Sequence, residues 1–170
     1  MIAFLKRWLS ERSERRVPTE PAQDTRDAFR ADLIPVLHAE HRELLALFAR
    51  MEQASLLDDE HTCRAVLQRF TALLREHLST ENRHLYGYFS RRADAHPDAS
   101  RQVAQMSTEM LRIGRELHGF IATYSQGEWS RDQQIQLRKD VYRVGAILRR
   151  RIDAEESRLY PLYQASSAAH

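Results

Sequence analysis

Two segments of the chain repeat a pattern of ionisable residues spaced four positions apart. REHLSTENRHLYGYF contains His77 and Glu81, and RRRIDAEESRLYPLY has Arg151 and Glu155 at the equivalent positions. Residues four apart project from the same side of a helix, so each pair offers two side chains to one site. Histidine and glutamate bind transition metals, whereas arginine stays protonated and cannot. The pattern indicates a metal site in which one copy carries a ligand and the other a fixed positive charge.

Other ionisable residues lie on the same apolar stripes. His41 and His118 fall among the inward positions of two further helices, and Glu156 follows Glu155 directly. Ionisable groups in a core are costly unless they are paired, hydrogen-bonded or bound to metal. One such histidine is more often a satisfied core residue than a ligand, so the prediction depends on convergence from four helices. His38, one turn before His41, is the alternative ligand from the first helix.

Composition and charge favour a single soluble helical domain. The chain has 170 residues, of which 42% are hydrophobic and 29% charged, with only five glycines and five prolines. The formal net charge of +2 gives no sign of a nucleic-acid partner, for which a concentrated basic face is expected. Cys63 is the only cysteine, which excludes an internal disulfide and is typical of a cytoplasmic protein.

Apolar periodicity predicts four amphipathic helices and no strand. The expected bounds are about Asp32 to Met51, about Asp59 to the RADAHPDAS loop, a Ser100 cap to Tyr124, and Ser130 to about Pro161. Ser130 and Gln133 have the spacing of a capping box. Short connections favour an all-α, antiparallel up-down four-helix bundle over residues 26–165.

The first 25 residues are expected to form a separate N-terminal segment. MIAFLKRWLSERSERR places Ile2, Leu5, Trp8 and Leu9 on one helical face with basic residues elsewhere, and a proline-containing linker follows. Its apolar part is too short for a signal peptide. We expect a short, frayed helical extension; the alternative is a weak contact of residues 1–16 with an anionic membrane surface or a partner.

Four runs together resemble the bacterial hemerythrin-like, or HHE cation-binding, domain: LHAEHRELLALF, HLSTENRHLYGYF, ELHGF and RIDAEESRLYPLY. The resemblance covers roughly Asp32 to Tyr163. Proteins of that family are four-helix bundles that hold a non-haem di-iron centre and bind O2 or sense oxygen, redox state or iron. Carried over position by position, the resemblance implies these ligands: His41, His77, Glu81, His118 and one of Glu155 or Glu156.

The sequence departs from the family pattern at two positions. The family often has a second histidine one turn before the residue matched by His118, where this chain has Gly114, and Arg151 replaces the histidine of the fourth helix. Both losses fall on the same iron. We therefore expect mononuclear iron rather than di-iron, with Mn or Zn as alternatives, and expect Arg151 to hold Glu81 and Glu155. The remaining alternative is a hydrogen-bonded network without metal.

The resemblance implies a cytoplasmic metal-binding protein that senses or regulates in response to oxygen, redox state or iron. One iron would not support the two-electron chemistry of a reversible O2 carrier. No nucleophile–base spacing, phosphate loop or nucleotide fingerprint indicates an enzyme. The alternative function is a metal-free helical module that binds a protein partner. It resembles the anti-sigma regulators related to the sigma-D regulator, whose last helix has an RxxxED-like element comparable with Arg151–Glu156. The metal, the signal, the partner and the oligomeric state stay open.

Overall fold

The computed structural model describes residues 29–91 and 97–167, and these residues form helices without any strand. The predicted all-helical bundle is confirmed at that level. The N-terminal extension and linker predicted for residues 1–25 lie outside the described residues. Within the described ranges, no helix is both long enough and apolar enough to cross a bilayer.

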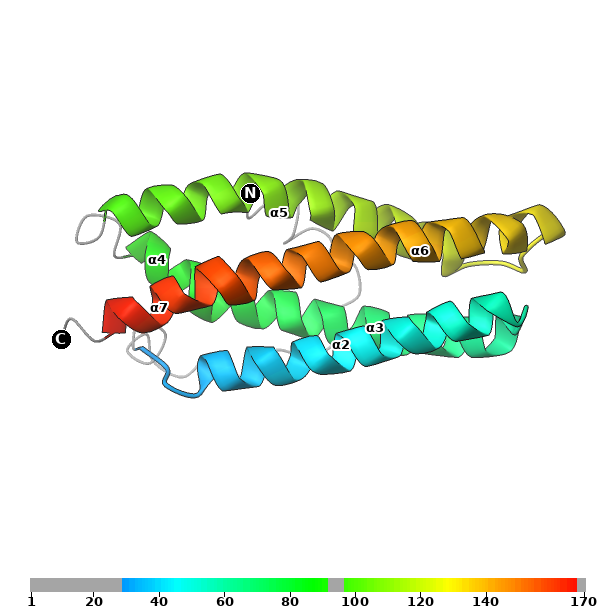
Figure 1. Ribbon diagram of the computed structural model, residues 1–170, viewed down its shortest axis with the longest axis horizontal. Coiled ribbons are helices and arrows are strands. Elements are labelled where there is room, and N and C mark those ends of the chain that lie inside the picture. The colour runs from blue at the N-terminus through cyan, green and yellow to red at the C-terminus, as the bar shows by residue number, and fades with distance from the viewer. Residues whose placement is uncertain (1–28, 92–96, 168–170) are drawn as a thin grey trace, which may run out of the picture.

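Four long helical rods make up the bundle (Figure 1). The first rod is helix α2, and the third is helix α5. The second and fourth rods each consist of two α-helices joined by a π-helical turn. Their bounds are α2 Leu33–Leu56; α3 Glu60–Thr80, η2 Glu81–Tyr86 and α4 Gly87–Arg91; α5 Pro97–Tyr124; and α6 Arg131–Ala154, η3 Glu155–Leu159 and α7 Tyr160–Ser167. In Figure 1 the α2–α3 and α5–α6 connections lie at the same end of the molecule.

Two helix starts have side-chain caps. Ser130 and Gln133 form the predicted capping box, with Gln133 N donating to Ser130 Oγ at 3.2 Å and Ser130 N donating to Gln133 Oε1 at 2.9 Å. Asp59 accepts a hydrogen bond of 2.9 Å from Thr62 N at the start of α3. These bonds satisfy N–H groups that the first turn of a helix leaves free.

Three predicted boundaries were wrong. The first helix ends at Leu56, five residues beyond the expected end at about Met51. The third helix begins at Pro97, three residues before the expected cap at Ser100, because a proline fits the first turn of a helix without loss of a hydrogen bond. The fourth rod does not end near Pro161 but continues to Ser167. Pro161 is the second residue of α7, just after η3, where the change from π to α hydrogen bonding accommodates a residue that lacks an N–H.

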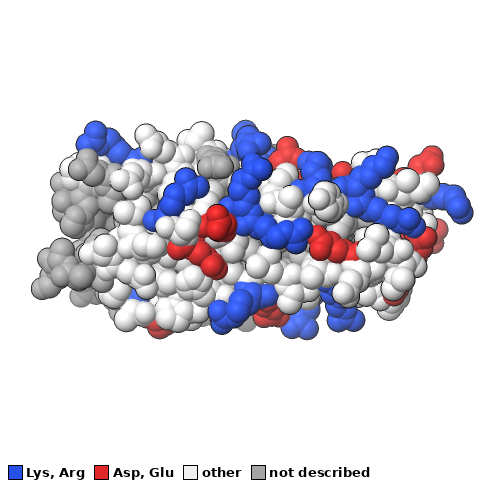
Figure 2. All heavy atoms as spheres, in the orientation of Figure 1, with Lys and Arg blue, Asp and Glu red and all other residues white. Residues whose placement is uncertain are grey.

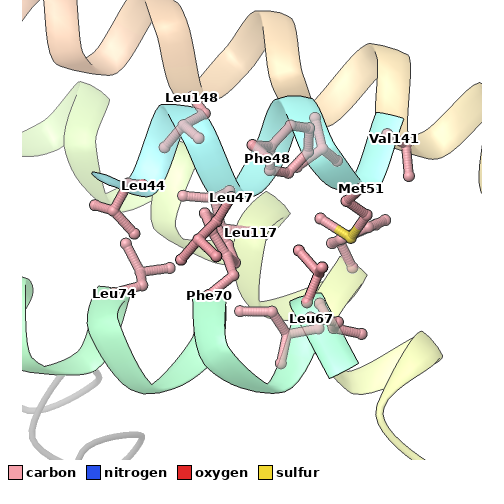
Figure 3. Close-up of a cluster of buried hydrophobic side chains, with 14 of the residues drawn as sticks. Leu44, Leu47, Phe48, Met51, Leu67, Phe70, Leu74, Leu117, Val141 and Leu148 are labelled. Carbon is pink, nitrogen blue, oxygen red and sulfur yellow. The ribbon is translucent and has the colours of Figure 1, made fainter. Parts of the chain in front are cut away.

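The core consists of two apolar clusters at different heights along the rods. The larger one lies toward the end of the bundle that contains the α2–α3 turn, and Figure 3 shows its leucines and Phe48 and Phe70 pointing toward one another from α2, α3, α5 and α6. The smaller one contains Leu37, Leu85 and Met106. Burial of these side chains, about 1.5–3 kcal/mol each, supplies most of the stabilisation.

Charged side chains cover the outside of the bundle. Figure 2 shows basic groups interspersed with acidic ones on the face in view. Some of these groups form ion pairs between helices, such as Arg143 with Glu116 at 2.6 Å and Arg149 with Glu52 at 3.0 Å. Such exposed pairs contribute little to stability, about 0–1 kcal/mol each.

Candidate metal centre

A layer of ionisable side chains separates the two apolar clusters. It consists of His41 from α2, His77 from α3, Glu81 from η2, Arg151 from α6 and Glu155 from η3, each no more than 4% exposed. Along each of these rods, residues of one apolar cluster precede the layer and residues of the other follow it. The predicted convergence of these five residues is therefore present in the structure.

The imidazoles of His41 and His77 face each other inside the layer. Their Nε2 atoms lie 3.2 Å apart. His41 Nδ1 lies 2.8 Å from Glu156 Oε1, and His77 Nδ1 lies 2.9 Å from Glu40 Oε2. A carboxylate only accepts hydrogen bonds, so each Nδ1 carries the hydrogen and donates it outward. Both Nε2 lone pairs are thereby directed inward, as in histidines that bind metals.

The separation of the two Nε2 atoms fits a shared metal. Two lone pairs at 3.2 Å repel each other unless a proton or a cation lies between them. A cation about 2.1 Å from each nitrogen would hold the nitrogens about 3.0–3.4 Å apart at octahedral or tetrahedral angles. The pair thus has the spacing of two ligands on one ion.

Glu81 and Glu155 complete a four-residue group able to hold a metal. One ligand atom from each of His41, His77, Glu81 and Glu155 lies within 4.8 Å of all the others. Glu155 Oε2 is 3.3 Å from His41 Nε2, and Glu81 Oε2 is 3.7 Å from His77 Nε2. Both Glu155 oxygens are buried and accept no well-directed hydrogen bond from any residue that the structure describes. Two imidazoles with one or two carboxylates suit Fe(II), Mn(II) or Zn(II).

Both carboxylates stand at the start of a π-helical turn. Glu81 begins η2 and Glu155 begins η3, at equivalent positions of the repeated segment. The wider turn changes the direction of the residues that follow relative to a continuous α-helix, and such turns frequently occur at functional sites. The repeat in the sequence thus corresponds to a repeated distortion of the backbone beside the buried layer.

Arg151 contacts both buried carboxylates of the layer. Its Nη2 lies 2.9 Å from Glu81 Oε2 and 2.7 Å from Glu155 Oε1. Burial opposes the charge of Arg151, but the two carboxylates outweigh burial and raise its pKa. Burial likewise opposes the charge of Glu155, but Arg151 and the histidines outweigh it and lower the pKa of this carboxyl. That Arg151 replaces a second metal stays a prediction.

Without a cation, Glu81 and His41 favour binding protons. Burial and the nearby charge of Glu155 raise the pKa of Glu81. Burial lowers the pKa of His41, but Glu155, Glu156 and Glu81 outweigh burial, and the pKa is raised overall. Tyr160 closes the layer, with its hydroxyl 3.3 Å from Glu81 Oε1 and 3.2 Å from His41 Nε2.

The family model of the Hemerythrin HHE cation binding domain matches residues 32–163. The chain belongs to the hemerythrin family. No curated protein and no solved structure matches it in the corresponding comparisons. The matched region contains every residue of the buried layer, so the ionisable groups described above lie within the hemerythrin domain.

The structure separates the two candidate carboxylates of the last rod. Within the hemerythrin domain, Glu155 lies in the buried layer, whereas Glu156 lies at its rim with its side chain 35% exposed. Glu156 contacts His41 Nδ1 and lies 3.0 Å from His38 Nδ1. Glu156 thus fixes the orientation of His41 rather than joining the inner group. His38 belongs to the rim, and His41 is the residue of α2 in the layer.

The structure does not bring His118 to the layer, contrary to the prediction. His118 is half-buried on α5 and belongs to neither group of residues able to hold a metal in the described part of the hemerythrin domain. On α5 the change from one apolar cluster to the other falls between Met106 and Met110. Met110 also lies beside Arg151, lining the same small cavity. His118 is two helical turns beyond this level, about 12 Å along the helix axis.

A count from the interhelical turn would have revealed this error. Arg151 lies 20 residues after the start of α6 at Arg131. The residues of α5 that lie opposite Arg151 should therefore stand about 20 residues before the end of α5 at Tyr124. His118 is only six residues from that end. The inward position of His118 and the family resemblance both led to a match at the wrong height.

Sequence reasoning missed Glu40 and Tyr160. Tyr160 had a signal, since it aligns with Tyr86 in the repeated segment. Glu40 had none, because adjacent helical residues point in different directions and only the packing of α2 on α3 brings Glu40 to His77.

Proposed function

We propose that this hemerythrin-family protein binds one non-haem iron ion between His41, His77, Glu81 and Glu155. We further propose that it works in the cytoplasm as a sensor or regulator of oxygen, redox state or iron, and that it is not an enzyme. The observation that carries the proposal is the facing pair of Nε2 atoms at 3.2 Å, each with its Nδ1 held by a carboxylate.

The side chains around this group have defined tasks. Glu156 and Glu40 hold the two imidazoles in the tautomer that directs Nε2 inward. Tyr160 donates to Glu81 and limits its rotation. The apolar clusters on both sides exclude water from the layer. We also propose that the rods run antiparallel, up and down, which the short α2–α3 and α5–α6 connections support. A bound iron would supply one-electron redox chemistry here.

The charge of the layer supports a divalent ion. With neutral imidazoles, two carboxylates and the guanidinium of Arg151 leave one negative charge in a buried environment. An uncompensated buried charge is costly, and its attraction for a cation is strong where the dielectric constant is low. Loss or oxidation of the ion would change this charge, and the packing of the rods around the layer would respond. Such a response is what a partner could detect.

The test is the metal content of purified protein from cells grown with added iron, manganese and zinc. We expect about one equivalent per chain, and loss of that metal in His77→Ala and Glu81→Ala. His61→Ala is the matched control, because His61 is an exposed histidine at the start of α3 and should leave metal content unchanged. Two equivalents in the wild type would contradict the proposed role of Arg151.

The alternative is a metal-free module that regulates a protein partner. The observation that favours it is the contact of Arg151 with both buried carboxylates, which offsets part of their charge without any ion. The same measurement separates the two proposals: a wild-type protein with full helicity and no bound metal supports the module, and a single equivalent excludes it.

A further inference from the structure

A second group of potential ligands lies at the rim of the layer. It consists of His38, His41 and Glu156, with one ligand atom of each within 4.8 Å of the others. Glu156 Oε1 lies 3.0 Å from His38 Nδ1 and 2.8 Å from His41 Nδ1. The side chains of His38 and Glu156 are 36% and 35% exposed, so this group meets solvent.

The inner group is closed to solvent and needs a route for its ion. His41, His77, Glu81 and Glu155 are each at most 1% exposed. The rim group borders this closed centre directly, because His41 belongs to both groups: its Nδ1 faces Glu156 and its Nε2 faces His77.

The opposite side of the layer is unsuited to a cation. A cavity of about 20 Å³ lies there, lined by Arg151, Glu81, Asn82 and Tyr86 together with apolar side chains that include Met110 and Leu111. The guanidinium of Arg151 is a fixed positive charge at this cavity and repels a divalent cation. The rim group presents a carboxylate and an imidazole instead.

We propose that His38 and Glu156 form a loading site, which receives a hydrated divalent cation from solvent and passes it to the buried centre by way of His41. The inference rests on the proposed function. A neutral imidazole has one lone pair, so His41 serves one group at a time and a single ion occupies the two groups in turn. As the hydrated ion passes inward, His41 Nδ1 takes a proton from solvent at the exposed rim and Nε2 gives one to a water that the ion sheds. The imidazole therefore stays neutral, and Nδ1 then donates a hydrogen bond to Glu156. His38 takes no part in the final complex.

The experiment measures the rates and the equilibrium of metal binding separately. Metal-free wild-type protein, His38→Gln and the control His61→Gln are mixed with Co2+ and followed by stopped-flow absorption, and release is followed after addition of a chelator. For His38→Gln we expect loading and release both slowed by about tenfold, the scale of losing one supporting contact at a metal site. The metal stoichiometry and the Kd should stay as in wild type. A side chain that binds the ion only on its way in or out changes the loading and release rates by the same factor, so their ratio is unchanged. His61→Gln should match wild type throughout.

Three results would overturn the inference. An unchanged loading rate in His38→Gln, with one equivalent still bound, would exclude the loading site and leave the proposed function intact. A lower stoichiometry or a weaker Kd in that variant would make His38 a ligand of the final complex. No binding of Co2+ by wild type would overturn the proposed function and this inference together. The variant should fold, since His38 is partly exposed and its ring contacts only Tyr160 among the described aromatic residues.

Discussion

Arg151 Nη2 lies 2.7 Å from Glu155 Oε1, one turn further along the same helical rod. The same nitrogen reaches Glu81 on a different rod, so a single guanidinium joins the two carboxylates across the core. Glu155 turns its other oxygen, Oε2, to His41 Nε2 at 3.3 Å, whereas Glu81 Oε2 lies beside both Arg151 and His77. The buried layer thus places a fixed positive charge directly beside the carboxylates and imidazoles that could hold a cation.

Arg151→Met should strongly destabilise the metal-free protein. The change leaves two carboxylates buried without their counter-charge, which costs about 3–5 kcal/mol. Urea unfolding of the metal-free proteins measures the difference. Arg149→Met is the matched control, because Arg149 pairs with Glu52 at the surface and its loss should cost about 1 kcal/mol or less. Equal losses in the two variants would show that Arg151 does not stabilise the carboxylates.

Arg151→His should raise the bound metal from one equivalent per chain toward two. A neutral imidazole beside Glu81 and Glu155 removes the repelling charge and adds a ligand. The second ion should bind more weakly than the first, because α5 presents Met110 and Leu111 at this level. Metal analysis after dialysis against increasing chelator measures both ions. A folded variant that still binds one equivalent would refute the prediction.

The metal-free protein should lose stability as pH rises above about 6.5. The pKa of His41 is raised above its usual 6.5 in the folded state, so its stabilisation is fully present below 6.5 and is lost as pH rises through the folded pKa. The raised pKa of Glu81 acts in the same direction. The slope is at most about 1.4 kcal/mol per pH unit for each proton. Urea titrations at pH 6 and 8.5 measure the loss, which should be smaller in His41→Gln.

Metal affinity should show the opposite dependence on pH. The ion competes with the protons that His41 and Glu81 bind in the metal-free state, so affinity should increase as pH rises over the same range. Competition with a chromophoric chelator at several pH values measures it. An affinity independent of pH would show that metal binding displaces no proton from the layer.

Gly145→Ala should destabilise the bundle although alanine favours helices. An added Cβ would lie 2.7 Å from Glu52 Oε1 and 2.8 Å from Phe48 Cε1, since α2 and α6 approach closely here. Overpacking of this kind costs about 1–3 kcal/mol. Gly114→Ala is the control, because no described side chain or neighbouring helix lies within 4 Å of its added Cβ, and the change should stabilise α5 by up to about 1 kcal/mol. Thermal unfolding of both variants tests whether the melting temperature falls for Gly145→Ala and rises for Gly114→Ala.

Cys63 should be unreactive in the folded protein. Burial, with a smaller effect from Asp59 and Glu60, raises the pKa of its thiol to about 11, and the side chain is almost completely buried. The thiolate is the reactive form, so little of it exists near pH 8. Labelling with a chromogenic disulfide should be slow at pH 8 and rapid in urea. Rapid labelling of native protein would mean that the α2–α3 end of the bundle opens readily.

Local patterns in the sequence determined the helices and the two ionisable pairs. The capping box at Ser130 and the i, i+4 pairs of His77 with Glu81 and Arg151 with Glu155 depend on residues a few positions apart, and helix geometry alone sets their relation. Apolar stripes show which side of each helix is buried, and the inward placement of these pairs follows from those stripes. These features needed no knowledge of how the helices pack.

Only the tertiary structure decided which residues share one height and which nitrogen faces which carboxylate. His118 shares the pattern but lies two turns away from the layer, because its height depends on the length of the α5–α6 connection. Glu155 and Glu156 are neighbours in sequence, yet the packing of the fourth rod places one in the core and the other at the rim. Glu40 reaches His77 only through the packing of α2 on α3. The periodicity of the sequence determines which side of its helix a residue faces. Which residues of other helices it contacts depends on how far one helix is shifted along another, and contacts between residues distant in sequence set that shift.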